Sequence, residues 1–167
     1  MKKTSLFTNH VSLQFNATYQ PIAYLTSPVP EPKDLCSIDI GEVQQLEKIE
    51  KGSFGEIFKA SWRGTIVALK KIPSANLTSP LIKELKREAA LMKSLRHPNV
   101  LQFLGTTTDP KDNDFVIVME FMPRGSLYRI IHNLSIDLPL DRIRNIALDA
   151  ARGMNYLHNL SPPIIHR

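Results

Sequence analysis

The chain has 167 residues, of which 43% are hydrophobic and 22% charged, and its formal net charge is +5. This length suits one domain of ordinary size, or part of a larger one, and the composition excludes a wholly disordered protein. Cationic side chains are densest over residues 83–96, where Glu84 and Glu88 interrupt them. We expect a solvated helix face there and no nucleic-acid partner, because nucleic acid calls for a more continuous basic stripe.

Residues 1–38 show no sustained hydrophobic periodicity and contain four prolines. We therefore expect a largely disordered tail or linker before a domain that begins at residue 39. No apolar run approaches the ~20 residues of a membrane span, and polar residues interrupt the stretch where a signal peptide needs an apolar core. The single cysteine, Cys36, can form no internal disulfide, which suits a reducing compartment. The expected location is the cytoplasm.

Alternation of apolar and polar residues begins at Val43 and predicts strands over residues 43–50, 56–62 and 65–72. Arg63-Gly64 is predicted to form the tight turn between the last two. A helix is expected to follow, with Ser79 as its N-cap and Pro80 at its first position, and His97-Pro98 ends it. Its apolar face carries Leu81, Leu85, Met92 and Leu95, with Glu88 on the same side.

Two further strands are predicted at residues 100–105 and 115–121, separated by the polar loop 106–114. Ser126 is expected to cap a short helix over residues 127–132, and residues 141–159 form a longer amphipathic helix. The order β-β-β-α-β-β-α-α lacks the strand–helix alternation of a doubly wound sheet. It predicts an α+β fold, in which a five-stranded antiparallel sheet and one packed helix precede the first helices of a helical region.

The stretch from Glu50 to Lys70 has the parts of a nucleotide clamp. Gly52 and Gly55 permit close backbone approach, Lys70 supplies a positive charge, and an apolar lid is expected from Ile57, Val67 and Ala68. An adenine needs the lid, and its phosphates need the glycine backbone and the lysine. Taken singly, each feature has a simpler interpretation, since such a glycine segment is commonly only a hairpin turn and such a lysine commonly faces solvent.

The order in which several such segments follow one another along the chain favours the nucleotide interpretation. The segments that carry it are Lys51-Gly52-Ser53-Phe54-Gly55-Glu56-Ile57, Val67-Ala68-Leu69-Lys70, Glu88, Leu95-Arg96-His97-Pro98-Asn99-Val100, Val118-Met119-Glu120-Phe121-Met122, Gly125-Ser126-Leu127, Met154-Asn155-Tyr156-Leu157-His158 and Ile165-His166-Arg167. With these segments the chain resembles the amino-terminal part of a eukaryotic protein kinase domain, of the tyrosine-kinase-like group that includes Raf and mixed-lineage kinases. The resemblance implies an N-lobe over residues 39–121, and the hinge and start of a C-lobe over residues 122–167.

The resemblance also implies an ATP site. Its residues are Ile49, Gly52, Ser53, Phe54, Gly55, Ile57, Ala68, Lys70, Glu88, Met119, Glu120, Met122 and Ser126. The glycine loop would cover the phosphates with Phe54 shielding them, Lys70 would contact the α- and β-phosphates, and Glu88 would hold Lys70. Met119 falls at the gatekeeper position, Glu120 and Met122 lie on the hinge, and Ser126 would contact the ribose.

Two departures from the family pattern affect this expectation. Glu50 occupies the first position of the glycine motif, where a carboxylate near polyphosphate weakens ATP binding if it points inward. The sequence stops at His166-Arg167, one residue before the expected catalytic aspartate, and the metal-binding asparagine and aspartate are absent from it. We therefore assign no catalytic residue and no metal ligand, expect Mg²⁺ only in a complete kinase, and expect no efficient phosphoryl transfer by this chain.

Three interpretations stay open at this point. The chain is the ATP-binding part of a protein kinase, serine/threonine-directed by group resemblance, that transfers the γ-phosphate of ATP to a protein hydroxyl. Alternatively, it is a catalytically dead short form that binds nucleotide or dimerises with full kinases, or the product of a truncated gene model. The protein substrate and any partner kinase are not specified by these residues, and neither is serine/threonine against tyrosine specificity.

Overall fold

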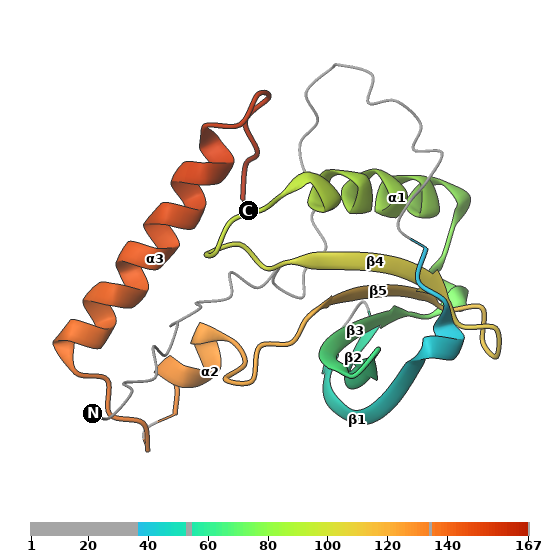
Figure 1. Ribbon diagram of the computed structural model, residues 1–167, viewed down its shortest axis with the longest axis horizontal. Helices are drawn as coiled ribbons and strands as arrows, with labels where there is room; N and C mark the ends of the chain where they lie inside the picture. The colour runs from blue at the N-terminus through green and yellow to red at the C-terminus, as the bar shows by residue number, and fades with distance from the viewer. Residues whose placement is uncertain (1–36, 53–54, 134, 167) are drawn as a thin grey trace.

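The computed structural model describes residues 37–52, 55–133 and 135–166. Five strands, three α-helices and two short 3₁₀ helices are formed within these ranges. In chain order they are η1 (Ile40–Glu42), β1 (Val43–Gly52), β2 (Gly55–Trp62), β3 (Thr65–Ile72), η2 (Ser74–Asn76), α1 (Ser79–Ser94), β4 (Phe103–Thr108), β5 (Phe115–Glu120), α2 (Leu127–Ile131) and α3 (Leu140–His158). The predicted α+β fold is therefore confirmed, and Figure 1 shows α1 lying along the sheet while α3 stands apart from it.

The strands form one sheet in the order β1-β2-β3-β5-β4, and every neighbouring pair is antiparallel. The predicted turn between β2 and β3 is confirmed: Arg63 has φ 48° and Gly64 has φ 78°. Two successive residues with positive φ give a turn whose twist matches that of the strands it joins. The β3 strand occupies the centre of the sheet, where both of its edges are hydrogen-bonded.

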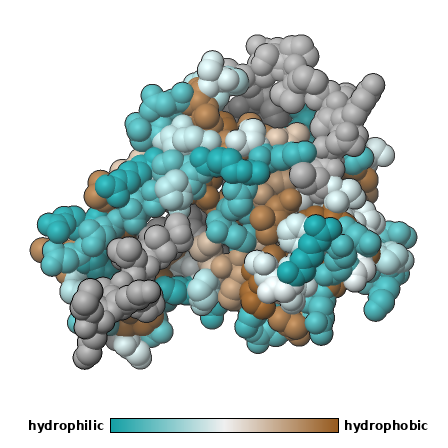
Figure 2. All heavy atoms as spheres, in the orientation of Figure 1, coloured by the Kyte–Doolittle hydropathy of each residue, from teal (hydrophilic) through white to brown (hydrophobic). Residues whose placement is uncertain are grey.

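Each face of the sheet has its own apolar cluster. On the face that α1 covers, Leu85, Ala89 and Met92 of the helix pack on strand residues that include Phe103 and Ile117. We call this the α1 face. The opposite, outer face carries a cluster of Ile38, Phe58, Ala60, Val67, Leu69, Val116 and Val118. Figure 2 shows hydrophilic side chains over the outward surface of α1 and hydrophobic ones between α1 and the strands.

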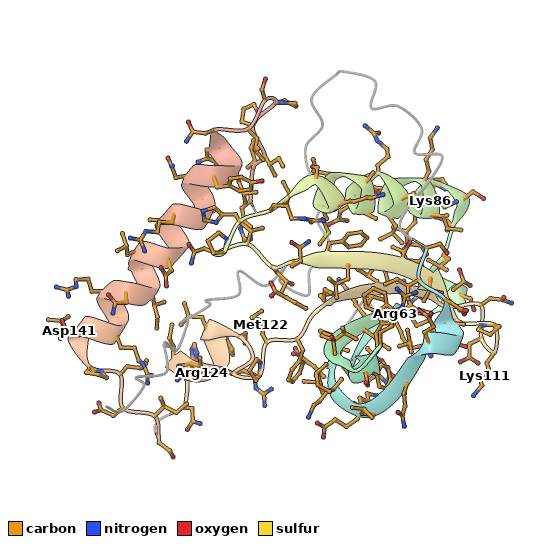
Figure 3. All side chains as sticks on the ribbon, in the orientation of Figure 1. Arg63, Lys86, Lys111, Met122, Arg124 and Asp141 are labelled. Atoms are coloured by element: carbon orange, nitrogen blue, oxygen red, sulfur yellow. The ribbon has the colours of Figure 1, made fainter. Side chains whose placement is uncertain are left out.

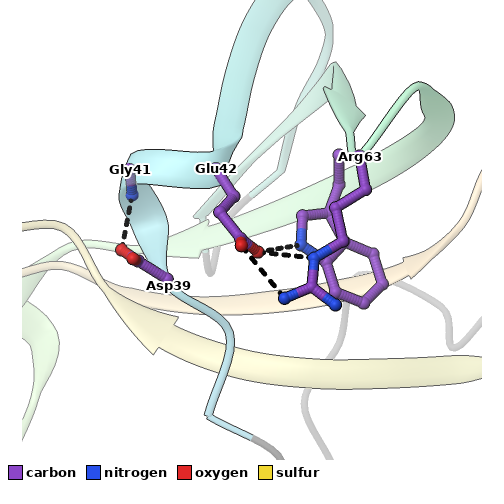
Figure 4. Close-up of polar contacts among 5 residues, drawn as sticks. Asp39, Gly41, Glu42 and Arg63 are labelled. Carbon is purple, nitrogen blue, oxygen red and sulfur yellow. Dashed lines mark hydrogen bonds and ion pairs between the residues drawn. The ribbon is translucent and has the colours of Figure 1, made fainter.

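The short segment before β1 packs against the outer face of the sheet. Ile38 is only 5% exposed within the outer cluster, and its N–H donates to the carbonyl of Thr106 on β4 over 2.9 Å. The Glu42 carboxylate accepts from the Arg63 guanidinium at 2.7 and 3.0 Å and from the Trp62 indole at 3.2 Å (Figure 4). Residue 38, at the end of the predicted tail, is therefore packed into the sheet, while residues 1–36 of that tail lie outside the described residues.

The boundaries of α1 differ from the prediction at both ends. Thr78, not Ser79, is the N-cap, because its Oγ1 accepts the Leu81 N–H at 3.4 Å. Pro80 consequently occupies the second helical position rather than the first. The helix ends at Ser94, ahead of the predicted stop at His97-Pro98, because Leu95 adopts extended dihedrals. Leu95 nevertheless stays buried.

The prediction for the fourth strand was shifted by three residues. β4 begins at Phe103 instead of residue 100, since Val100 is held in a turn by an N–H donated to the His97 carbonyl. It continues through Thr106 to Thr108, residues assigned to the loop. Their β-branched side chains favour an extended strand, and this signal was available in the sequence.

After β5 the chain leaves the sheet. The predicted cap of the short helix is confirmed, because Ser126 Oγ accepts the Arg129 N–H at 3.3 Å. At its C-terminal end α3 contacts the segment that follows α1: the Arg96 N–H donates to the Tyr156 hydroxyl at 3.1 Å, and the His97 ring stacks on the Tyr156 ring at 4.8 Å. The remainder of α3 exposes apolar side chains, among them Leu140 and Ile143.

Candidate functional site

Cross-strand register brings the predicted lid and the predicted lysine to one face of the sheet. Ile57 on β2 is paired with Lys70 on β3, and Ala68 is paired with Met119 on β5. Directly paired residues project to the same side of a sheet, so all four lie on the α1 face. Val67 lies on the outer face instead and is fully buried in its cluster. Its assignment to the lid was therefore wrong.

Glu88 faces this lysine from α1. It lies three residues after Leu85 and four before Met92, so it shares their inward side of the helix. Burial lowers the pKa of Lys70 and raises the pKa of Glu88, and each group partly offsets the shift of the other. Among the described residues no direct ion pair joins the two. A partly desolvated ammonium thus lies near a carboxylate without a direct ion pair between them.

The glycine turn joins the ends of β1 and β2, where Gly52 and Gly55 are paired. Ser53 and Phe54, the predicted phosphate-covering residues, lie outside the described residues. Gly55 has φ 149°, and a Cβ at this position would lie 2.1 Å from the Lys71 carbonyl oxygen. This glycine is therefore required by close packing of β2 on β3, a reason that sequence analysis did not supply.

The other β1 residues of the predicted site lie next to an irregularity in the strand. The register shifts between Lys48 and Glu50, so Ile49 is unpaired and partly buried. Glu50 is exposed and paired with Ile57. The register therefore places the carboxylate-bearing residue on the same face as Lys70, at the margin of the site.

The predicted hinge residues follow Met119, which packs partly buried against the α1-face cluster. Glu120 is tied to β4, because its N–H donates to the Gln102 carbonyl at 3.0 Å and its carboxylate accepts the Gln102 N–H at 2.6 Å. Met122 lies in the connection between β5 and α2 (Figure 3), and its carbonyl accepts the Gly125 N–H at 3.0 Å. The hydroxyl oxygen of Ser126 caps α2, which leaves its hydrogen able to be donated.

One residue of this region was missed by sequence analysis. Lys59 is paired with Ala68, so it also lies on the α1 face. Its Nζ is 2.9 Å from Glu47 Oε1 and 5.5 Å from the centre of the Phe121 ring. The period-two pattern of β2 could have found it, because Lys59 stands two residues after Ile57.

A hollow of about 320 Å³ lies elsewhere. Its lining residues are Arg96, His97, Pro98, Val100, Gln102 and Glu120. Only Glu120 belongs to the predicted ATP site, so this hollow is not the candidate nucleotide site.

The described residues contain no group of three or more His, Cys, Asp or Glu side chains able to hold a metal ion. Within the same ranges, no helix is long and apolar enough to cross a membrane.

Comparison with known proteins identifies relatives. Residues 43–167 match the family model described as protein tyrosine and serine/threonine kinase. The probable serine/threonine-protein kinase drkA of Dictyostelium discoideum is 46% identical over 135 residues, which cover 81% of this chain and 21% of that protein. In Arabidopsis thaliana, the probable serine/threonine-protein kinase SIS8 is 47% identical over 132 residues (79% of this chain, 13% of SIS8), and the serine/threonine-protein kinase CTR1 is 45% identical over 123 residues (72% and 15%). The chain thus spans about a fifth or less of the length of these relatives.

Proposed function

Because this chain belongs to the protein tyrosine and serine/threonine kinase family, we propose that residues 39–167 form the ATP-binding portion of a serine/threonine protein kinase. In this proposal residues 39–121 are the N-lobe, residues 122–167 are the hinge and the start of the C-lobe, and residues 1–38 are a tail whose last residue, Ile38, packs on the sheet. The names of the relatives support the serine/threonine assignment. The substrate of the proposed kinase is a protein hydroxyl.

The observation that carries the proposal is a half-buried Lys70 that faces Glu88 of α1, on the same face of the sheet as Ile57 and Ala68. An ordinary surface lysine would stay fully hydrated and would need no carboxylate opposite it. Burying an ammonium is unfavourable, and the burial is explained if the charge is needed for a ligand. A polyphosphate is such a ligand, because each phosphate oxygen accepts a charge-assisted hydrogen bond.

Each residue then has a physical task. Ile57 and Ala68 cover the adenine with apolar surface, and Lys70 donates to the α- and β-phosphates. Glu88 holds Lys70 in place through their electrostatic attraction, as a positioning residue. Backbone groups of the segment from Glu120 to Met122 hydrogen-bond the adenine edge. The family implies that Mg²⁺ neutralises the β- and γ-phosphates during transfer, and we assign no ligand for it in these residues.

The test is to measure the affinities of ATP and of adenosine for the 167-residue chain by calorimetric titration. We expect Lys70→Met to weaken ATP binding about tenfold or more, the usual effect of losing a charge-assisted hydrogen bond. Adenosine affinity should stay within about twofold of wild type, since adenosine has no phosphate for the lysine to contact.

Lys71 provides the matched control. It is the next residue along β3 and projects to the outer face, where it donates to Asp109 at 2.7 Å. Lys71→Met removes the same charge from the same strand, and it should leave both affinities unchanged for the folded protein. A wild-type chain that binds neither compound, or a Lys70→Met variant that binds ATP as tightly as wild type, would overturn the proposal.

A further inference from the structure

Lys59 connects the first hairpin of the sheet to the chain that leaves β5. Its Cα is paired with that of Ala68, and its side chain is 31% exposed. The ammonium lies 2.9 Å from the Glu47 carboxylate on β1 and 5.5 Å from the centre of the Phe121 ring. The first distance is that of a charged hydrogen bond, and the second lies within the range of a cation–π interaction. One side chain therefore joins β1, β2 and the residue that directly follows β5.

The segment after β5 is held from its other side as well. Glu120 is bonded to Gln102 of the β4 approach through both its N–H and its carboxylate, at 3.0 and 2.6 Å. Successive residues of an extended chain project to opposite sides. Glu120 is thereby tied toward β4, and Phe121 toward β1 and β2.

These two ties have different consequences for an adenine site. The tie through Glu120 lies within the β4–β5 half of the sheet, so it fixes the hinge relative to its own strand. The tie through Lys59 reaches across to the β1–β2 hairpin, which carries the lid residue Ile57 and the glycine turn. On the opposite, outer face, the hairpin reaches β5 through the apolar cluster in which Phe58 and Ala60 pack with Val116 and Val118. On the face of the lid, Lys59 provides the contact with Phe121. The separation between lid and hinge backbone is the dimension that an adenine ring must fill.

We propose that Lys59 is a positioning residue that fixes this separation by holding Phe121 against the β1–β2 hairpin, with Glu47 keeping the ammonium in place. The inference rests on the proposed nucleotide function. Lys59 acts at the adenine end of the site, whereas Lys70 acts at the phosphate end. The roles of Lys59 and Lys70 can thus be distinguished by comparing a ligand that has phosphates with one that has none.

The experiment measures ATP and adenosine affinities of the full 167-residue chain and its variants. Lys59→Met keeps most of the aliphatic stem and removes the charge. It should weaken both compounds by the same factor, about threefold to tenfold, the usual range for losing a partly exposed cation–π contact with its ion pair. Lys59→Arg, which preserves both contacts, should restore wild-type affinities. In a Phe121→Leu background, Lys59→Met should have little further effect.

Lys48 offers a matched control. It also forms an ion pair across the β1–β2 hairpin, with Glu56 at 2.5 Å, and it is paired with Phe58 on the outer face. Lys48→Met should leave both affinities unchanged. Thermal unfolding of every variant establishes that the compared proteins are folded. Amide hydrogen exchange in the unliganded chain gives a second readout, and it should be faster over residues 120–122 in Lys59→Met than in Lys59→Arg.

The outcomes separate this inference from the function on which it rests. A wild-type chain that binds neither compound overturns both. Wild-type binding with a Lys59→Met variant that binds adenosine as tightly overturns the role of Lys59 alone. Loss of ATP affinity without loss of adenosine affinity would also overturn it, because it would show that Lys59 acts on phosphate. Equal loss of both, rescued by arginine, is the expected result.

Discussion

Replacing Gly55 by alanine tests the reason for glycine at the start of β2. The residue has φ 149°, a backbone conformation that side chains rarely adopt, and a Cβ there would lie 2.1 Å from the Lys71 carbonyl oxygen. Ordinary van der Waals contact begins at 3.4 Å, so the new carbon would be about 1.3 Å too close. The obstacle is backbone of the central strand, which cannot move aside as a flexible side chain does.

Two contributions set the expected loss of stability. A side chain in an unfavourable backbone conformation costs about 1–3 kcal/mol. Forcing an extra methyl group into a packed region costs about 1–3 kcal/mol more, because neighbouring strands must shift. We therefore expect Gly55→Ala to lower the free energy of unfolding by about 2–6 kcal/mol, the sum of the two contributions. That is a large part of the stability of an ordinary domain.

Gly64 is the matched control, since it has φ 78° but no atom within 4 Å of the added Cβ. Gly64→Ala should lower the free energy of unfolding by only about 1–3 kcal/mol, the backbone contribution alone. Urea unfolding followed by the fluorescence of Trp62, the only tryptophan, measures both variants. If Gly55→Ala proves no more destabilising than Gly64→Ala, the steric argument fails, and room for phosphates becomes the remaining reason for this glycine.

Three further predictions concern charge and packing. The hydrogen bond from the Lys71 ammonium lowers the pKa of Asp109, and the hydrogen bond from the Lys111 backbone N–H lowers it further. The ionised Asp109 carboxylate therefore stabilises the folded protein above the unfolded pKa of about 3.9, and this stabilisation is lost as pH falls through the lower pKa of the folded state. Asp109→Asn should reduce stability by about 1–2 kcal/mol at pH 7 and flatten the acid side of the urea midpoint–pH curve. Replacing Lys70 and Glu88 together by methionine should leave unfolding free energy unchanged or raise it by about 1–2 kcal/mol, with each single variant less stable than the double one. Ile38→Ala should cost about 2–4 kcal/mol in the same assay, because the side chain is 5% exposed.

The two adjacent lysines of β3 show how much of the candidate site could be predicted from the sequence. Alternation fixed that Lys70 and Lys71 project to opposite faces, but the sequence contains nothing that says which face α1 covers. The structure assigns Lys70 to the α1 face and Lys71 to the outer face, where Asp109 of the β4–β5 loop binds it. Lys70 was selected for its position at the end of the third strand and for its motif, and its contact with phosphate stays a prediction.

The error over Val67 has the same origin. Val67 and Ala68 are both apolar and adjacent, so either suits a lid by composition alone. Only the register with β5, which pairs Ala68 with Met119, separates the predicted lid residue Ala68 from the outer cluster. The shifted start of β4 is a related case. Val100 has the apolar character of a strand residue, but a turn after α1 holds its N–H.

Local chemistry in the sequence determined the elements and their order. These signals are local: turn residues with positive φ, a capping hydroxyl before α2, and period-two alternation. Each acts over a few residues, so it can be recognised without knowing any contact distant in the sequence. Membership of the family followed from eight segments in order. The resemblance had implied that Glu88 faces Lys70. What tertiary structure alone decided is which other residues meet across long separations, such as Glu42 with Arg63 and Lys59 with Phe121. Such contacts depend on strand order and helix placement, which result from packing the whole sheet and which no short stretch of sequence encodes.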